Sequence, residues 1–220
     1  MPLPSKLSKA KNWKTVLEYA ESIRDGRKIA CVELKQAIDR FFADLENPEY
    51  EMDPKAPEFC IGIIEKTLCH QQGEKLDGTP LRGTPFLLEP FHKFIIYNLV
   101  GFKLAWTDIV RFHEALIFIP RKNIKTSFAA SLAWALSLWY RKSGAKTYIA
   151  AAALMQTLES FNFLDYNVKR MGEDQKDGGH VHVIDNNNEH SMEADLGDGS
   201  FYIRALAANP DAQDSLNCNL

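Results

Sequence analysis

The stretch "ALIFIPRKNIKTSF" at residues 115–128 determines how the rest of the chain is interpreted. Its first part is continuously apolar, which is typical of a strand buried on both faces of a parallel sheet. From Thr126 onward, "TSFAASLAWALSLWYRK" is apolar on nearly all sides and is followed by Ser143 and Gly144, which predicts a buried helix. A buried strand, a short basic loop and a helix are therefore expected in this order.

The loop between this strand and helix has part of a phosphate-binding pattern. In G-x-x-x-x-G-K-[ST], backbone amides and the helix N-terminus surround the phosphates, the lysine neutralises them, and the hydroxyl binds Mg²⁺. Lys125 and Thr126 occupy the last two positions, but Ile119 and Ile124 stand where glycines are expected. The strand and helix on either side favour a phosphate site over a Lys-Thr pair that opens a helix by chance.

Ile124 is the larger departure from the pattern. Glycine at this position lets the backbone approach the phosphates and tolerates positive φ, whereas a β-branched residue there costs about 1–3 kcal/mol. Either the loop takes another shape or nucleotide binding is weakened. We expect weak binding that replacement of Ile124 by glycine would tighten.

The chain before residue 90 is expected to be mainly helical. Three amphipathic patterns, beginning near Trp13, Leu34 and Pro57, indicate an N-terminal helical subdomain over residues 1–80. Residues 73–90, "GEKLDGTPLRGTPFLLEP", contain three glycines and three prolines, so a linker is predicted there. Pro90 then begins a short helix that Gly101 closes.

Residues 81–220 are expected to form the core of the fold. After the buried helix, "AKTYIAAA" at 145–152 predicts a strand and "LMQTLESFNFLDYNVKRM" at 154–171 another helix. Beyond Gly172, three short strands are joined by "DNNNE" and "GDG" turns, which favour a hairpin. The alternation predicts an α/β fold with a parallel sheet and helices on both of its faces.

Charge and apolar content narrow the class of protein. Of the 220 residues, those at 91–150 carry a net +7 and those at 151–220 a net −8, within a total of −3. The positive segment contains the loop and suits a polyphosphate ligand, although a solvated surface gives the same count. No run of eighteen apolar residues occurs, and the start lacks a signal-peptide pattern, so a soluble cytosolic protein without membrane contact is expected.

Neither the cysteines nor the histidines favour a metal site. The four cysteines lack a CxxC pair and are interpreted as free, buried thiols: Cys31, Cys60, Cys69 and Cys218. His180, His182 and His190 are interpreted as polar strand residues because no fourth ligand accompanies them.

Several segments together resemble one family. "FIPRKNIKTSFAASLAWAL" resembles the Walker A segment of the large terminase subunit of tailed phages, the ATPase of the DNA-packaging motor. The segments "YAESIRDGRKIACVELKQAIDRFFADLENP", "FCIGIIEKTLCHQQGE", "PFLLEPFHKFIIYNLVGF" and "IRALAANPDAQDSLN" resemble that family in the same order. The resemblance implies a P-loop, RecA-like ATPase core at residues 81–220, with ATP and Mg²⁺ as cofactors.

The resemblance also implies roles for individual residues. Lys125 would contact the β and γ phosphates, and Thr126 would bind Mg²⁺. Arg121 would stabilise the transferring phosphoryl group, a charge that Lys122 could supply instead. The remaining loop positions of the expected nucleotide site are Pro120, Asn123, Ile124 and Ser127.

His92 stands where the family usually has a glutamine that contacts adenine. A neutral imidazole has its donor and acceptor on opposite sides of the ring, so it cannot present both to one base edge. An ordinary helix histidine is the alternative interpretation.

At the level of function, the resemblance implies packaging of viral double-stranded DNA into procapsids in the cytoplasm of a bacterial host, coupled to DNA cleavage. The implied partners are a portal protein, a small terminase subunit and possible further copies of the chain. The strand ending in Asp-Glu and the nuclease domain expected after "LAANPDAQDSLN" are absent from the 220 residues, so we expect a truncated ATPase piece without turnover. The alternatives are a non-catalytic interaction module with a degenerate loop and another P-loop enzyme such as a helicase.

Overall fold

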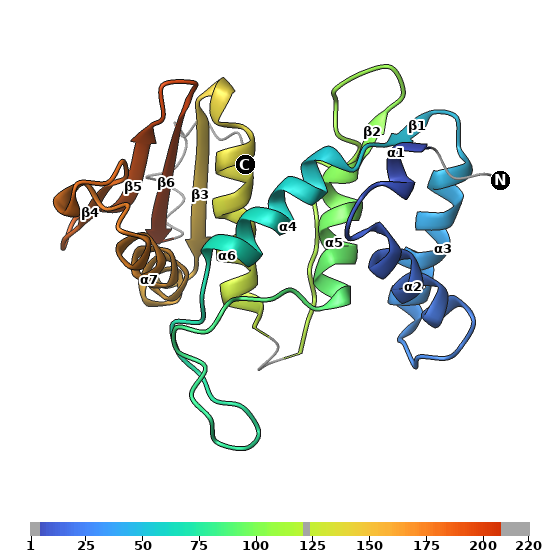
Figure 1. Cartoon of the computed structure of the whole chain (residues 1–220), viewed down its shortest axis with the longest axis horizontal. Coiled ribbons are helices and arrows are strands. Elements are labelled where there is room, and N and C mark those ends of the chain that lie inside the picture. Colours follow the sequence, from blue (N-terminus) through green and yellow to red (C-terminus); the bar gives the residue numbers. More distant parts are fainter. Residues whose placement is uncertain (1–4, 121–123, 208–220) are drawn as a thin grey trace. The chain divides into compact units, whose positions relative to one another are not determined.

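The chain forms two compact units, each built from two stretches of sequence. The computed structural model describes residues 5–120 and 124–207 (Figure 1). One unit comprises residues 1–62 and 87–118, and the other comprises residues 63–86 and 119–220. These units do not follow the boundary between residues 80 and 81 that the linker composition predicts, and that domain division stays a prediction.

The first unit consists of helices around an aromatic core. Its elements are α1 (Ser5–Ser8), α2 (Trp13–Arg24), α3 (Val32–Glu46), β1 (Tyr50–Met52), the start of α4 (Lys55–Thr67), α5 (Pro90–Gly101) and β2 (Phe102–Leu104). The ring of Phe41 lies within 6.0 Å of the rings of Trp13, Phe94 and Phe102. Apolar residues at helical spacing thus converge on one buried cluster, as the periodicity predicts.

Helix α4 ends at Thr67, several residues before the linker predicted over residues 73–90. The following residues instead form a hairpin-like excursion, in which Cys69 bridges Pro85 and Glu74 bridges Pro80. Asn167 fixes its base by accepting the Cys69 amide at 2.7 Å and donating to the Cys69 carbonyl at 3.2 Å.

The second unit is an α/β structure with a four-stranded sheet. Its elements are α6 (Lys125–Trp139), η1 (Arg141–Ser143), β3 (Ala145–Ala151), α7 (Leu154–Met171), η2 (Gln175–Asp177), β4 (His182–Asp185), β5 (His190–Asp195) and β6 (Ser200–Ala207). The strand order is β3-β6-β5-β4. Strands β3 and β6 are parallel, and the β4–β5 and β5–β6 pairs are antiparallel hairpins. The α/β class and the hairpins are confirmed, whereas the sheet is mixed and not purely parallel.

Both long helices of this unit cover the same face of the sheet. Helices α6 and α7 contact one another (Figure 1). The Trp134 ring of α6 meets Phe201, and the Phe161 ring of α7 meets His190. The register pairs Phe201 with Ala194, four residues from His190, so both contacted side chains share a face. The expected helices on both faces are therefore wrong for the described part of the chain.

The predicted strand before the loop is also wrong. Residues 114–120 form no strand, and Leu116 and Phe118 are each 94% exposed. A strand requires a hydrogen-bonded neighbour, and within residues 5–120 and 124–207 none pairs with this segment. An apolar run alone therefore did not suffice to place a central strand.

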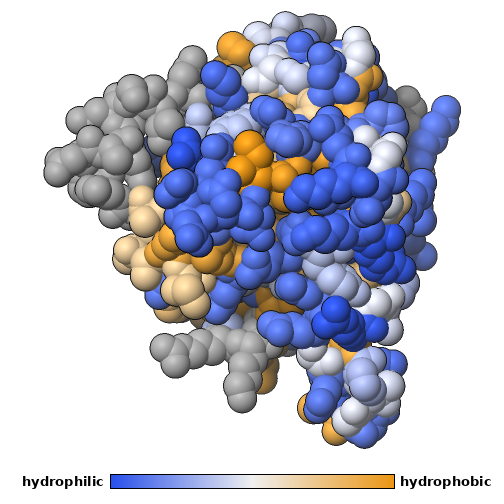
Figure 2. Space-filling view, turned by 90° about the vertical axis from the view of Figure 1, so that its left-hand side faces the viewer, coloured by the Kyte–Doolittle hydropathy of each residue, from blue (hydrophilic) through white to orange (hydrophobic). Residues whose placement is uncertain are grey.

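The surface of the chain is mainly polar on the face seen in Figure 2. The face shown in Figure 2 is largely hydrophilic, with its apolar residues in small groups. Among the described residues, no helix combines the length and apolar character needed to span a bilayer.

Cys60 and Cys69 are buried free thiols, and burial raises the pKa of Cys60 to about 12. Cys31 is free but exposed, contrary to expectation, and Cys218 lies outside the described residues.

Candidate functional site

The candidate site is the N-terminus of α6 together with the residue that precedes it. Helix α6 begins at Lys125, and its first intrahelical bond is donated by the Phe128 amide to the Ile124 carbonyl at 2.8 Å. The amides of the three residues before Phe128 precede this bond, so they belong to the helix turn whose N–H groups have no intrahelical acceptor. No acidic side chain lies in this first turn. The positive end of the helix dipole is thus available to an anion.

Ile124 adopts the backbone conformation that the glycine of the phosphate-loop pattern normally supplies. It is the N-cap of α6 with φ 54° and ψ 21°, in the left-handed region. Only one other non-glycine residue among those described has positive φ. A β-branched residue in this region is strained by about 1–2 kcal/mol. The sequence offered two outcomes for Ile124, and the structure shows residue 124 itself in the left-handed conformation.

The site lies at the carboxyl ends of the two parallel strands. The chain reverses between α6 and β3, and Ser137 near the end of α6 contacts Thr147 near the start of β3 at 2.6 Å. The start of α6 therefore lies toward the other end of β3, where β6 also ends because the pair is parallel. Ligands in open α/β sheets bind at this end.

The helix that carries the site is firmly held. Its buried side chains surround most of the helix circumference, as its apolar sequence predicts. The Ser137–Thr147 contact and the Trp134–Phe201 ring pair, at 5.4 Å, anchor its second half to the sheet. Ser131 donates to the Ser127 carbonyl at 2.6 Å in its first half. A rigid helix keeps its N-terminal amides in fixed positions.

The predicted loop residues divide into those that the structure describes and those that it does not. Lys125 is exposed, Thr126 and Ser127 are half-buried, and Pro120 is exposed. Residues 124–127 are brought together at the helix start. Arg121, Lys122 and Asn123 lie outside the described residues. The described side chains thus offer one cation and two hydroxyls next to the helix amides, a donor set that fits a polyphosphate with its metal ion.

His92 is buried in the first turn of helix α5, a position that the sequence did not indicate. It is 1% exposed and lies at the third position of α5, in the first unit. Its Nδ1 accepts the Glu89 amide at 3.2 Å, which completes a capping box with the Glu89 side chain. Burial lowers the pKa of His92 to about 4, so the ring is neutral at physiological pH. Nδ1 is thus engaged within α5, and the adenine contact stays a prediction.

A cavity on the sheet of the second unit is a separate feature. It has a volume of about 630 Å³ and is lined by the start of β3, the end of β5 and the start of β6, with Lys146, His182, Glu193 and Tyr202 among its residues. It therefore lies at the opposite end of the sheet from the α6 N-terminus. None of the loop residues that the structure describes lines it, so we treat it apart from the phosphate site.

Each of the three histidines considered as metal ligands faces a different acidic residue. His180 contacts Glu173 at 3.0 Å, His190 contacts Asp185 at 2.7 Å, and His182 pairs with Glu193 across the strands. In the described ranges, no group of three or more His, Cys, Asp and Glu side chains could hold a metal ion.

Comparison with known proteins gives one match. The sequence model of the family described as terminase large subunit, ATPase domain, matches residues 90–220, which is more than half of the chain. Neither the curated proteins nor the solved structures provide a significant match. The matched region contains α5, the loop and the whole sheet of the second unit.

Proposed function

We propose that this chain, which belongs to the terminase large subunit family, binds Mg-ATP at the N-terminus of α6 as the ATPase part of a viral DNA-packaging motor. The observation that carries the proposal is the left-handed residue 124 directly before a helix that opens with Lys125 and Thr126. This is the local backbone that a phosphate loop needs, although isoleucine supplies it. The family match covers this segment.

Each loop residue has a proposed role. Lys125 would neutralise the β and γ phosphates, and the Thr126 hydroxyl would bind the Mg²⁺ that accompanies the nucleotide. The amides of residues 125–127 would donate hydrogen bonds to the phosphate oxygens. Arg121 would compensate charge on the transferring phosphoryl group, with Lys122 as the alternative. The bound magnesium and nucleotide would supply the phosphoryl chemistry, and these residues would hold them in place.

The wider function follows from the family and is likewise proposed. In the parent protein, ATP use would drive viral double-stranded DNA into procapsids and would be coupled to DNA cleavage. Its partners would be a portal protein, a small terminase subunit and further copies of the same chain. We place the second unit in the P-loop, RecA-like class on the strength of the α6 site and the family match.

The dependence of binding on Mg²⁺ tests the role of Thr126. A fluorescent ATP analogue is titrated into the wild type and Thr126→Ala, once with Mg²⁺ and once with EDTA. We expect Thr126→Ala to weaken binding about tenfold with Mg²⁺ and hardly at all with EDTA, because only the metal contact is lost. Equal losses in both conditions would show that Thr126 does not act through the metal.

A non-catalytic interaction module is the second candidate, and Ile124 is the observation that favours it. The strain at this residue is the kind of departure that a disused nucleotide loop would tolerate. Saturable binding of Mg-ATP distinguishes the two candidates, since the module requires none.

A further inference from the structure

The cavity on the sheet of the second unit has as its floor one row of side chains that crosses all four strands. The strand register aligns Lys146 of β3 with Tyr202 of β6, Tyr202 with Glu193 of β5, and Glu193 with His182 of β4. All four residues line the cavity, and we call them the Tyr202 row. A cation, an aromatic ring, a carboxylate and an imidazole thus follow one another across the sheet.

The Tyr202 row lies on the face of the sheet that α6 and α7 do not cover. Its neighbours along the strands, Ala145, Phe201 and Ala194, are at most 5% exposed, and Phe201 meets the Trp134 ring of α6. Successive side chains of a strand point to opposite faces, so the row projects away from the helices. The lysine, glutamate and histidine of the row are exposed, and its tyrosine is half-buried. The row is therefore accessible to a ligand.

The ring of Tyr202 is held in place at the centre of the row. Its hydroxyl donates to Oε1 of Glu189 at 3.0 Å, and the same oxygen accepts the Ser191 hydroxyl at 2.8 Å. The Tyr148 ring meets the Tyr202 ring edge-on, with 6.4 Å between their centroids. A fixed aromatic ring can contact a flat or apolar group without first being ordered, which lowers the entropic cost of binding.

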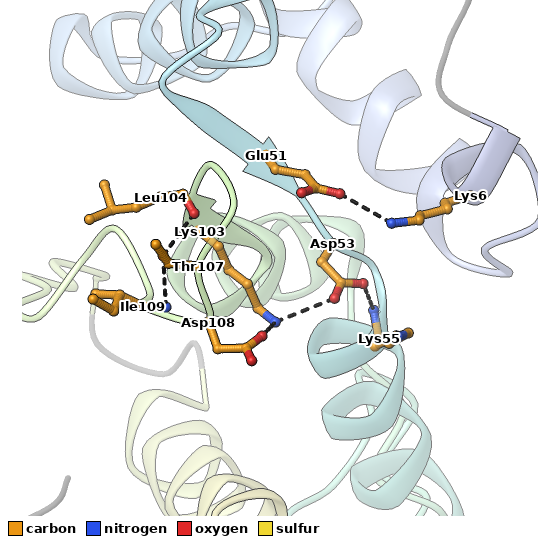
Figure 3. Close-up of polar contacts among 9 residues, drawn as sticks. All are labelled: Lys6, Glu51, Asp53, Lys55, Lys103, Leu104, Thr107, Asp108 and Ile109. Atoms are coloured by element: carbon orange, nitrogen blue, oxygen red, sulfur yellow. Dashed lines mark hydrogen bonds and ion pairs between the residues drawn. The ribbon is translucent and has the colours of Figure 1, made fainter.

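The carboxylates of the cavity lack the cations that accompany other carboxylates of this protein. Glu193 and Asp195 both line the cavity, and neither pairs with a basic side chain in the part of the chain that the structure describes. In the first unit, by contrast, Asp53 and Asp108 both lie next to the Lys103 ammonium, at 3.4 and 3.1 Å (Figure 3). This end of the cavity is therefore complementary to a cationic group of a ligand.

Lys146 places a positive charge at the opposite end of the row. Two strand spacings, about 9.5 Å, separate its backbone from that of Glu193. A single amino acid is too short to contact both charges, whereas an extended dipeptide, at about 7 Å, is the shortest peptide that can approach both. The cavity volume of about 630 Å³ is within the range of small-molecule sites.

We propose that this cavity binds a short peptide with a free ammonium and a free carboxylate group. The ammonium contacts Glu193 and Asp195, the carboxylate contacts Lys146, and an apolar side chain of the peptide lies on the ring of Tyr202. Gln175 lines the same cavity and can hydrogen-bond to the peptide group. Because the ligand is small and the cavity is open, the dissociation constant is on the order of 0.1–1 mM.

Titration of the dipeptide Ala-Phe, followed by NMR chemical shifts of the protein amides, tests this site. We expect saturable binding that weakens at least fivefold for N-acetyl-Ala-Phe, which lacks the cation, and for Ala-Phe-amide, which lacks the anion. Glu193→Gln should weaken Ala-Phe binding at least fivefold but should hardly change that of N-acetyl-Ala-Phe. The matched control is Glu159→Gln, which removes an exposed carboxylate of α7 and should change the constant less than about twofold. Thermal melting confirms that both variants are folded.

The outcomes separate this proposal from the nucleotide site. Lys125→Ala should bind Ala-Phe as the wild type does, because Lys125 does not line the cavity. No shift of any amide by Ala-Phe up to about 10 mM overturns the proposal. Equal binding of Ala-Phe by the wild type and Glu193→Gln, or an equal loss in Glu159→Gln or Lys125→Ala, also overturns it.

Discussion

Replacement of Ile124 by glycine should tighten the binding of Mg-ATP. Ile124 has φ 54°, a conformation that costs a β-branched residue about 1–2 kcal/mol. This cost favours competing conformations of residue 124 in the free protein, and the apparent dissociation constant rises by the inverse of the left-handed fraction. Glycine removes the cost, and the expected gain is about tenfold, within a range of about 5–30-fold.

The side chain and the backbone of Ile124 can be separated by a second variant. Ile124→Ala removes most of the side chain but has nearly the same difficulty with positive φ, whereas Ile124→Gly relieves both. We expect calorimetric titration to show a gain in affinity for glycine and little for alanine. A similar gain in both variants would assign the effect to steric crowding of the phosphates. Equal affinity of Ile124→Gly and the wild type would refute the reasoning altogether.

The stability of the Ile124→Gly variant serves as the control for this experiment. Relief of strain by about 1–2 kcal/mol is opposed by the greater entropy of glycine in the unfolded chain and by loss of the partly buried side chain, which is 38% exposed. The free energy of unfolding should therefore change by less than about 1 kcal/mol, so a gain in affinity would not reflect a better folded protein.

Three further predictions concern buried polar contacts within the two units. His92→Gln should keep the capping box and remove a pH dependence. The folded-state pKa of His92 is about 4, below its ordinary 6.5, so its contribution of about 3 kcal/mol is present above pH 6.5 and lost as the pH falls toward 4. Urea unfolding at several pH values measures this, and the exposed His113→Gln should behave as the wild type. Arg111→Met should destabilise the chain by about 3 kcal/mol, because it leaves the buried carboxylate of Asp44 with only the more distant Arg40, at 3.9 Å. The control is Arg27→Met, which removes the exposed Arg27–Asp25 pair and should change the free energy of unfolding by less than about 0.5 kcal/mol. Equal losses of stability in the two variants would show that burial of the ion pair is unimportant. Asn167→Ala should cost about 2–4 kcal/mol by leaving the Cys69 amide and carbonyl unpaired, which thermal melting would reveal as a lower Tm. An unchanged Tm would mean that the excursion is held by other contacts.

The helices and most strands could be predicted from the sequence because local signals mark them. Helix α5 runs from Pro90 to Gly101 as expected, since proline suits a first helical position and glycine ends the pattern. Helix α7 covers residues 154–171 as predicted, followed by the left-handed Gly172. The "GDG" and "DNNNE" turns correctly gave the hairpins of the sheet.

The failures concern features that depend on distant parts of the chain. Whether residues 115–119 form a strand depends on a neighbouring strand, and no local pattern supplies that information. The cap formed by His92 was missed because glutamate or glutamine is the usual residue at that helix position. The exposed, left-handed Trp106 was not anticipated, because a single exposed tryptophan leaves no periodic signal.

At the candidate site, the sequence pattern predicted the local backbone at the start of α6. Lys125 and Thr126 open the helix as expected, and residue 124 has the conformation that the pattern requires of glycine. The roles of Arg121, Lys122 and Asn123 stay predictions, because these residues lie outside the described part of the chain.

Isothermal titration of Mg-ATP into the wild type and Lys125→Ala tests the central claim most directly. Lys142→Ala is the matched control, because Lys142 is an exposed lysine of the same unit that precedes β3, at the other end of the sheet. We predict saturable binding by the wild type and Lys142→Ala, and a loss of at least tenfold in Lys125→Ala. Absence of binding by the wild type, or equal binding by Lys125→Ala, would contradict a nucleotide site at the N-terminus of α6.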